Sequence, residues 1–236
     1  MRTNGLCFLD IILYNIIMDK KIILKDKDIR EPLFDFLDGI YYPNRILEEK
    51  DIGNSRADVV MVTNEAIFGI EIKSDADTYT RLERQIEDYD AYFDYNYIVV
   101  GTSHARSVTE KVPEHWGIIT VEQDGDNADF YMMRRPARNS KWTWKLRLRM
   151  LWRPEMVQIQ EKTNMPKYAR LSKISLIDKM IEKIEPDELQ KYFCQALMER
   201  DYTTIAETIN NYREANAQKK RKKRKYKRRK KKHYTS

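Results

Sequence analysis

The sequence predicts an α/β fold in which helices flank a mixed β-sheet, and three observations lead to that prediction. Two extended runs, 56–63 and 66–73, are separated by only two residues, a spacing typical of an antiparallel β-hairpin. The next segment, 78–93, carries apolar residues at helical intervals. An apolar run of strand length, 97–101, follows it. The order hairpin, helix and strand indicates a sheet with both antiparallel and crossover connections.

Further elements complete the predicted sheet and its first covering helix. A helix over 28–37 has Pro32 in its first turn, where a missing N–H costs little, and Gly39 is placed to end it. Additional extended runs cover 45–50 and 117–121, with an edge strand at 128–134.

Beyond residue 141 the strand signals stop and helical patterns follow. Apolar residues at helical spacing indicate three helices, through Ile174, Ile177, Ile181 and Ile184, then Leu189, Phe193 and Leu197, then Ile205, Ile209 and Tyr212. Pro186 is placed to begin the second of these. The expected organisation is an N-terminal extension (1–27), an α/β core (28–140), a C-terminal helical appendage (141–218) and a disordered basic tail (219–236).

The net charge of +7 is unevenly distributed along the chain. Residues 219–232 hold 13 of the 44 Lys and Arg residues and no acidic residue, which leaves 31 basic against 37 acidic residues elsewhere, a net charge of −6. A run of like charges does not fold alone, and it suits a polyanion such as nucleic acid. A merely solubilising tail is the competing interpretation.

Cysteine usage and hydropathy indicate a reducing, cytoplasmic location. Cys7 and Cys194 lie far apart and belong to no CxxC or Cys/His cluster, so neither a disulfide framework nor a zinc site is indicated. The most apolar stretch, 6–18, is too short and too polar to span a bilayer, and it lacks the features of a secretory signal. No membrane partner is therefore expected.

Ionisable residues on the hairpin carry the predicted chemistry. Side chains two apart in a strand share a face, so Glu71 and Lys73 point to one side while the intervening Ile72 points to the other. In a hairpin that turns at 64–65, Asp58 lies roughly opposite Glu71. Two carboxylates at such close range raise each other's pKa, so a pair of this kind usually holds a cation, and hard oxygen ligands suit Mg²⁺ or Mn²⁺.

A metal ion at Asp58 and Glu71 would polarise a phosphodiester and activate water, while Lys73 would orient that water or neutralise developing negative charge. An amphipathic hairpin with exposed charges is the competing interpretation, because the string D-x12-E-x-K is common by chance.

The order Asp58, Glu71-x-Lys73, then Gln85 and Tyr89 on the next helix resembles the PD-(D/E)XK phosphodiesterase superfamily. The segments RADVVMV, GIEIKSDADTYTRLERQIEDYDAYFDYNYIVVG and VPEHWGII are similar to a bacterial and phage nuclease-like subfamily without an assigned biological role. The resemblance implies a restriction-endonuclease-like core in which Asp58 and Glu71 bind metal, Lys73 assists catalysis and Gln85 supports the site. Ala57 stands where the superfamily has proline.

The resemblance also implies a further acidic ligand from the first helix or strand. Glu48 is the preferred candidate for this third metal ligand. Glu31 on the predicted helix and Glu49 on the strand are the alternatives.

Two basic segments are candidate nucleic-acid contacts. The stretch 141–153 interleaves three tryptophans with five basic residues, and indoles stack on bases while cations meet phosphates. Helix packing through Leu148 and Leu151 explains the same pattern equally well. The residues expected to touch nucleic acid are Lys145, Arg147 and Arg149 here, and Lys220, Arg221 and Lys222 in the tail.

The leading functional hypothesis is a metal-dependent nuclease acting on DNA in a phage, mobile-element or repair context. The rival is a catalytically silent protein that uses a nuclease-like fold to bind DNA or a protein partner. A tRNA or RNA processing enzyme is a third option. The C-terminal helices are the expected surface for a homodimer or a protein partner.

Overall fold

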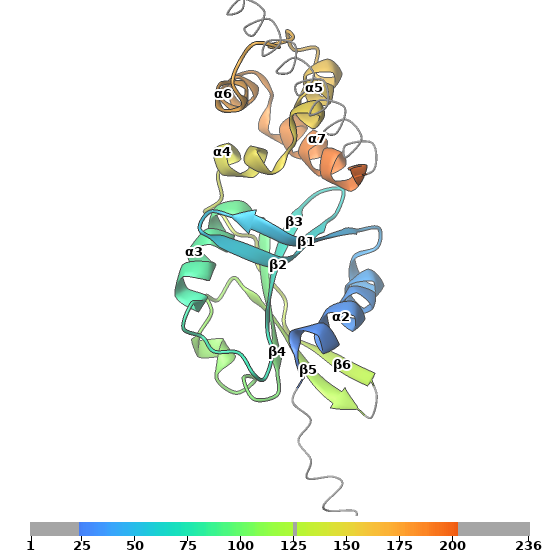
Figure 1. The fold of residues 1–236 in the computed structure, drawn as a ribbon, viewed down its shortest axis with the longest axis vertical. Coiled ribbons are helices and arrows are strands. Elements are labelled where there is room, and N and C mark those ends of the chain that lie inside the picture. The colour runs from blue at the N-terminus through green and yellow to red at the C-terminus, as the bar shows by residue number, and fades with distance from the viewer. Residues whose placement is uncertain (1–23, 125–126, 203–236) are drawn as a thin grey trace, which may run out of the picture. The chain divides into compact units, whose positions relative to one another are not determined.

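The computed structural model describes residues 24–124 and 127–202, and it shows an α/β fold built on a six-stranded mixed sheet (Figure 1). The strands, in sheet order, are β1 (Arg45–Ile52), β2 (Ser55–Val62), β3 (Ile67–Lys73), β4 (Tyr95–Gly101), β5 (Gly117–Asp124) and β6 (Asn127–Arg134). The β3–β4 and β4–β5 pairs are parallel and the other three pairs are antiparallel. The predicted mixed sheet and the predicted edge strand are therefore confirmed.

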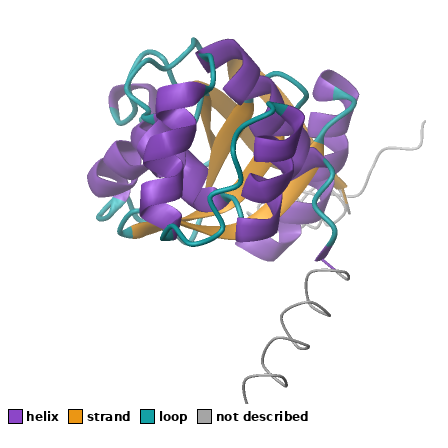
Figure 2. Cartoon of the chain, turned by 90° about the horizontal axis from the view of Figure 1, so that it is seen from above, coloured by secondary structure: helices purple, strands orange, loops and turns teal. Residues whose placement is uncertain are grey.

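Helices lie on both sides of this sheet (Figure 2). They are α2 (Asp26–Tyr41), α3 (Leu82–Tyr92), α4 (Trp144–Arg147), α5 (Arg153–Lys162), α6 (Lys173–Lys183) and α7 (Pro186–Met198), with short 3₁₀ turns η1 (Val108–Glu110) and η2 (Leu148–Met150). The first helix is longer than predicted, because it begins at Asp26 and continues past Gly39. The second is shorter, because residues 78–81 lie outside it.

Two clusters of buried residues hold the layers together. On one face of the sheet, Ile29, Leu33 and Leu37 of α2 share a cluster with strand residues such as Ile70 and Ile72. On the other face, α3 and the C-terminal helices share a cluster with strand residues of opposite parity. Alternate residues of each strand thus serve alternate layers, which is the two-residue period of a strand.

The β2–β3 hairpin has the predicted register. Val59 pairs with Ile70 and Val62 pairs with Ile67, and the N–H of Thr63 donates to the carbonyl of Ala66 at 2.9 Å across the turn. The same register continued by one residue places Asp58 opposite Glu71.

Gly69 lets α3 lie close against this hairpin. A Cβ at this position would come within 2.2 Å of the Phe93 ring and 2.6 Å of the Tyr89 ring. The absence of a side chain is thus what allows Tyr89 of α3, and Phe93 directly after it, to rest on β3.

The helices after residue 141 pack into the second cluster. Leu189, Phe193 and Leu197 of α7 are buried as predicted, and Pro186 begins that helix. Only two of the four residues on the apolar face predicted for α6, Ile177 and Ile184, are buried. The structure buries Leu176, Ile177, Met180 and Ile184, and leaves Ile174 and Ile181 exposed.

The boundary between core and appendage at residues 140 and 141 stays a prediction. The helix expected through Ile205, the N-terminal residues 1–23 and the tail 219–236 lie outside the described residues. Within the described residues, no helix is long and apolar enough to cross a membrane.

Candidate active site

The predicted catalytic residues line a single cavity of about 530 Å³. Its wall combines the first turns of α2, parts of β1 and β2 with their connecting turn, the end of β3 and the start of α3. Asp58, Glu71, Lys73 and Gln85 all belong to this wall. Further charged residues of the wall include Asp26, Arg30, Glu49, Arg56, Arg81 and Arg84.

Glu71 is buried at the centre of this group and is held by three donors. Its Oε1 accepts hydrogen bonds from Nζ of Lys73 at 2.5 Å and from Nε2 of Gln85 at 2.6 Å. Its Oε2 accepts from the hydroxyl of Tyr89 at 2.7 Å. Glu71 and Lys73 share a face of β3, as predicted, and this face is turned toward α3, which supplies the other two partners.

Gln85 completes a closed ring with this pair. Its Oε1 accepts from Nζ of Lys73 at 3.1 Å while its Nε2 donates to Glu71. A side-chain amide can do both at once because it carries a donor and an acceptor. The polar residue that interrupts the apolar face of α3 therefore fixes the orientation of both Glu71 and Lys73.

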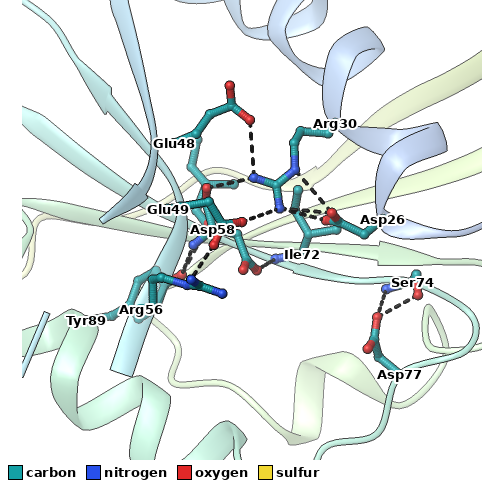
Figure 3. Close-up of polar contacts among 11 residues, drawn as sticks. Asp26, Arg30, Glu48, Glu49, Arg56, Asp58, Ile72, Ser74, Asp77 and Tyr89 are labelled. Atoms are coloured by element: carbon teal, nitrogen blue, oxygen red, sulfur yellow. Dashed lines mark hydrogen bonds and ion pairs between the residues drawn. The ribbon is translucent and has the colours of Figure 1, made fainter. Parts of the chain in front are cut away.

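Asp58 faces the same cavity from β2. Its Oδ2 accepts from the backbone N–H of Ile72 at 2.9 Å (Figure 3). Burial, and then the charge of Glu71, raise the pKa of Asp58 to about 7 from its ordinary value of 3.8. This half-buried carboxyl is thus poised to lose or gain a proton near neutral pH.

Tyr89 contacts the carboxylate of Glu71 and the backbone of Asp58. The N–H of Asp58 donates to the Tyr89 hydroxyl at 3.2 Å, and that hydroxyl lies against Glu71. Burial, and then the negative charge of Glu71, raise the pKa of Tyr89 well above its ordinary value. The phenol therefore keeps its proton and remains a donor to Glu71 at neutral pH.

Asp58 and Glu71 are the residues that could hold a divalent cation of the Mg²⁺ type. Among the described residues, Oδ1 of Asp58 accepts no hydrogen bond, and Oε2 of Glu71 accepts only that of Tyr89. Burial raises the pKa of Asp58 most and the negative charge of Glu71 raises it further, and a bound cation would offset that charge. In the part of the chain that the structure describes, no group of three or more His, Cys, Asp or Glu side chains is arranged to hold a metal. Water and substrate oxygens would fill the remaining positions, which is usual for Mg²⁺.

The structure places Glu48, the preferred third ligand, outside the cavity wall. Its Oε2 lies 3.4 Å from Nη1 of Arg30. Glu31 lines a different hollow on the opposite side of α2, beside Asp35 and Asn127. Glu49 does line the cavity, but it is ion-paired with Arg30 and Arg56 at 3.0 and 2.7 Å.

Asp26 and Arg30 are residues of this site that sequence reasoning missed. They lie one turn apart at the start of α2, and their side chains form a bidentate ion pair with contacts between 2.9 and 3.1 Å (Figure 3). The spacing of Asp26 and Arg30 could have indicated the pair, because residues four apart on a helix are placed to form an ion pair. The expected helix began two residues too late to include Asp26.

The prediction that Arg147 contacts nucleic acid is corrected. Its side chain is fully buried and forms a two-point ion pair with Asp94, at 3.1 and 2.6 Å. The guanidinium also lies 4.1 Å from the ring centre of Trp142 and 5.1 Å from that of Trp144. A planar cation with five donors and aromatic stacking partners is well suited to such a buried position.

The neighbouring basic residues remain on the surface. Lys145 and Arg149 are exposed, and Lys145 makes a surface ion pair with Asp178 at 3.3 Å. Leu148 and Leu151 are buried, so this segment packs into the core and presents only part of its basic face. The predicted contacts Lys220, Arg221 and Lys222 lie outside the described residues.

Comparison with known protein families finds a match that covers most of the chain. The family described as Bacteriophage P4 protein cII matches residues 21–227, which cover the whole sheet, the cavity and the C-terminal helices. Neither the curated proteins nor the solved structures contain a significant match to the chain.

Proposed function

The chain belongs to the Bacteriophage P4 protein cII family, and we propose that it is a metal-dependent nuclease that hydrolyses phosphodiester bonds of DNA. One observation carries this proposal. Asp58 and Glu71 face the same cavity from paired strands, and Lys73 and Gln85 are locked onto Glu71 by mutual hydrogen bonds. An ordinary amphipathic hairpin would expose these charges to solvent, whereas Glu71 and Lys73 are buried here.

We further propose that the core is restriction-endonuclease-like and of the PD-(D/E)XK type. Support comes from the order of helix, antiparallel hairpin, helix and parallel strand, with the acidic pair on the hairpin and the glutamine on the second helix. Ala57, in the place of the superfamily's proline, is buried next to Asp58, and Asp58 faces the cavity.

Each residue has a distinct role in the proposed reaction. Asp58 and Glu71 would hold Mg²⁺ or Mn²⁺, which when bound polarises the phosphodiester and makes water a better nucleophile. Lys73 carries a positive charge into the cavity wall, where it neutralises negative charge that develops in the transition state. Gln85 and Tyr89 keep the Glu71 carboxylate in one orientation, which is the preorganisation that electrostatic catalysis requires.

The charges around the cavity support a polyanionic substrate. Arg56, Arg81 and Arg84 are exposed on its wall and are placed to meet phosphates. The basic run 219–232 would add affinity that does not depend on base sequence. A phage or mobile-element setting agrees with the family to which the chain belongs.

The test is cleavage of circular and linear DNA, single- and double-stranded, with Mg²⁺, Mn²⁺ or EDTA. We expect cleavage with either metal and none with EDTA, and a loss of at least 100-fold in Asp58→Asn, Glu71→Gln and Lys73→Met, the scale of removing one electrostatic group. Glu83→Gln is the matched control, because Glu83 is an exposed carboxylate of α3 outside the cavity wall.

The same experiment separates the alternatives. Metal-independent DNA binding without cleavage under any condition would favour the catalytically silent binder. Cleavage of RNA alone would favour the processing enzyme. Equal activity in wild type and Asp58→Asn would remove the proposed site.

A further inference from the structure

Arg30 occupies the middle of a second acidic group that adjoins Asp58. Its guanidinium meets Asp26 from the same helix and Glu48 and Glu49 from β1 (Figure 3). Nη1 also donates to the backbone carbonyl of Asp58 at 3.0 Å. The Arg30 side chain is only 14% exposed, although its three acidic partners are between 40 and 50% exposed.

The donors of this guanidinium are fully used. Nε and Nη2 contact Asp26, Nη2 also contacts Glu49, and Nη1 contacts both Glu48 and the Asp58 carbonyl. Arginine has five N–H donors in a fixed fork, and this arrangement has a partner in each direction of the fork. Although burial opposes it, ion pairing with Asp26 raises the pKa of Arg30 above its ordinary value. The position therefore holds a permanent cation.

The positive charge of Arg30 affects how many metal ions the cavity can hold. Asp26 and Glu49, which both contact Arg30, line the cavity together with Asp58 and Glu71, and the wall also includes Asp51 and Asp77. A wall with this many carboxylates could supply ligands for two divalent ions, the arrangement of two-metal phosphodiesterases. With Arg30 in place, no group of three or more acidic side chains in the described residues is arranged around a metal position. The guanidinium already neutralises the outer carboxylates, and its own positive charge opposes a second metal ion nearby.

We propose that Arg30 takes the place of a second metal ion, so that the centre binds one divalent cation, at Asp58 and Glu71. This inference rests on the proposed function for the identity of the first site. Arg30 is a positioning residue in this scheme, since it acts through the carboxylates and through the Asp58 carbonyl.

Counting bound Mn²⁺ in the full-length protein tests the inference without measuring activity. By isothermal titration calorimetry we expect one Mn²⁺ per chain in the wild type and in Arg30→Lys, which keeps the charge. Arg30→Met should bind a second Mn²⁺, and electron paramagnetic resonance should show the two ions spin-coupled, as adjacent ions are. Asp58→Asn should lose the first.

Two results would overturn the inference: two Mn²⁺ in the wild type, or a single Mn²⁺ in a folded Arg30→Met. Asp26→Asn keeps the inference testable if Arg30→Met does not fold. Asp26 is already ion-paired with Arg30, so Asp26→Asn should still bind one Mn²⁺. The Mn²⁺ affinity should change by less than about threefold, the effect of a small change in surface electrostatics. A loss above tenfold would mean that Asp26 itself binds the metal.

The Mn²⁺ count and the cleavage assay together distinguish failure of the proposed nuclease function from failure of the proposed role of Arg30. A wild type that binds one Mn²⁺ but cleaves nothing contradicts the nuclease and leaves the role of Arg30 standing. A wild type that binds none, with Arg30→Met binding one, contradicts the proposed first site and supports exclusion by Arg30. No binding in either protein would contradict both.

Discussion

The hydroxyl of Tyr89 lies 2.7 Å from Oε2 of Glu71, and it also accepts the backbone N–H of Asp58 at 3.2 Å. One side chain of α3 therefore links the carboxylate of Glu71 on β3 to the backbone of Asp58 on β2. Because Gly69 lets the Tyr89 ring rest on β3, the contact depends on a residue that has no side chain.

Tyr89→Phe is expected to weaken both the fold and the metal site. The change leaves buried polar groups of Glu71 and Asp58 without their partner, which costs about 1–3 kcal/mol of unfolding free energy. Mn²⁺ affinity should fall as well, because Glu71 loses the bond that orients Oε2. Urea unfolding and calorimetric titration measure the two effects.

Tyr92→Phe is the matched control for that experiment. Its hydroxyl accepts the N–H of Gly53 at 3.2 Å, on the same helix but away from both carboxylates. Tyr92→Phe should lower the free energy of unfolding and leave the Mn²⁺ affinity unchanged. Equal Mn²⁺ affinity in Tyr89→Phe and the wild type would contradict the orienting role.

The metal-free protein should become less stable as pH rises from about 4 to about 7. The pKa of Asp58 is raised to about 7 in the fold, so the folded chain keeps a proton there that the unfolded chain loses near pH 4. Stability falls wherever the folded state binds more protons, and the loss is complete above pH 7. Thermal melts across this range should show the decline, and Asp58→Asn should reduce it.

Metal binding should show the opposite dependence on pH. Mn²⁺ must displace the Asp58 proton below pH 7, so its apparent affinity should rise by up to about tenfold per pH unit until pH 7 and then level off. Calorimetry at several pH values checks this. An affinity that is flat between pH 5.5 and 7 would exclude Asp58 as a ligand.

Arg147→Met should destabilise the fold without a specific effect on DNA binding. The change strands the buried carboxylate of Asp94, which costs about 3–5 kcal/mol. The double variant Arg147→Met with Asp94→Asn should recover part of this loss.

Lys145→Gln and Arg149→Gln, on the surface of the same segment, should change stability by less than about 0.5 kcal/mol and are expected to weaken DNA binding. Denaturant unfolding and DNA titration distinguish these outcomes.

Deleting the chain after residue 218 should change the salt dependence of DNA affinity. If six to ten of the 13 basic residues in 219–232 meet phosphates, the slope of log K against log salt becomes shallower by about 5–9 units. Single-turnover cleavage at saturating protein should hardly change, because the cavity is intact. An unchanged slope would show that the tail does not touch DNA and would favour a solubilising role.

The sequence by itself determined the features that depend on one element or on a short loop. The two-residue period of a strand was enough to put Glu71 and Lys73 on one face, and a two-residue turn was enough to set Asp58 opposite Glu71. The intervals of α3 likewise placed Gln85 and Tyr89 toward the sheet. These relationships involve one element or one short turn, so they can be predicted from the spacing of residues along the chain.

Only the tertiary structure decided which helix ends and surfaces meet. The start of α2 lies beside β1 and β2, and this brings Asp26 and Arg30 to the cavity and turns Glu48 into a partner of Arg30. Asp94 and Arg147 are 53 positions apart, and no spacing rule reveals that a basic residue between tryptophans is a buried ion-pair partner. Contacts of this kind depend on how whole layers pack, and the pattern within one segment is compatible with more than one packing.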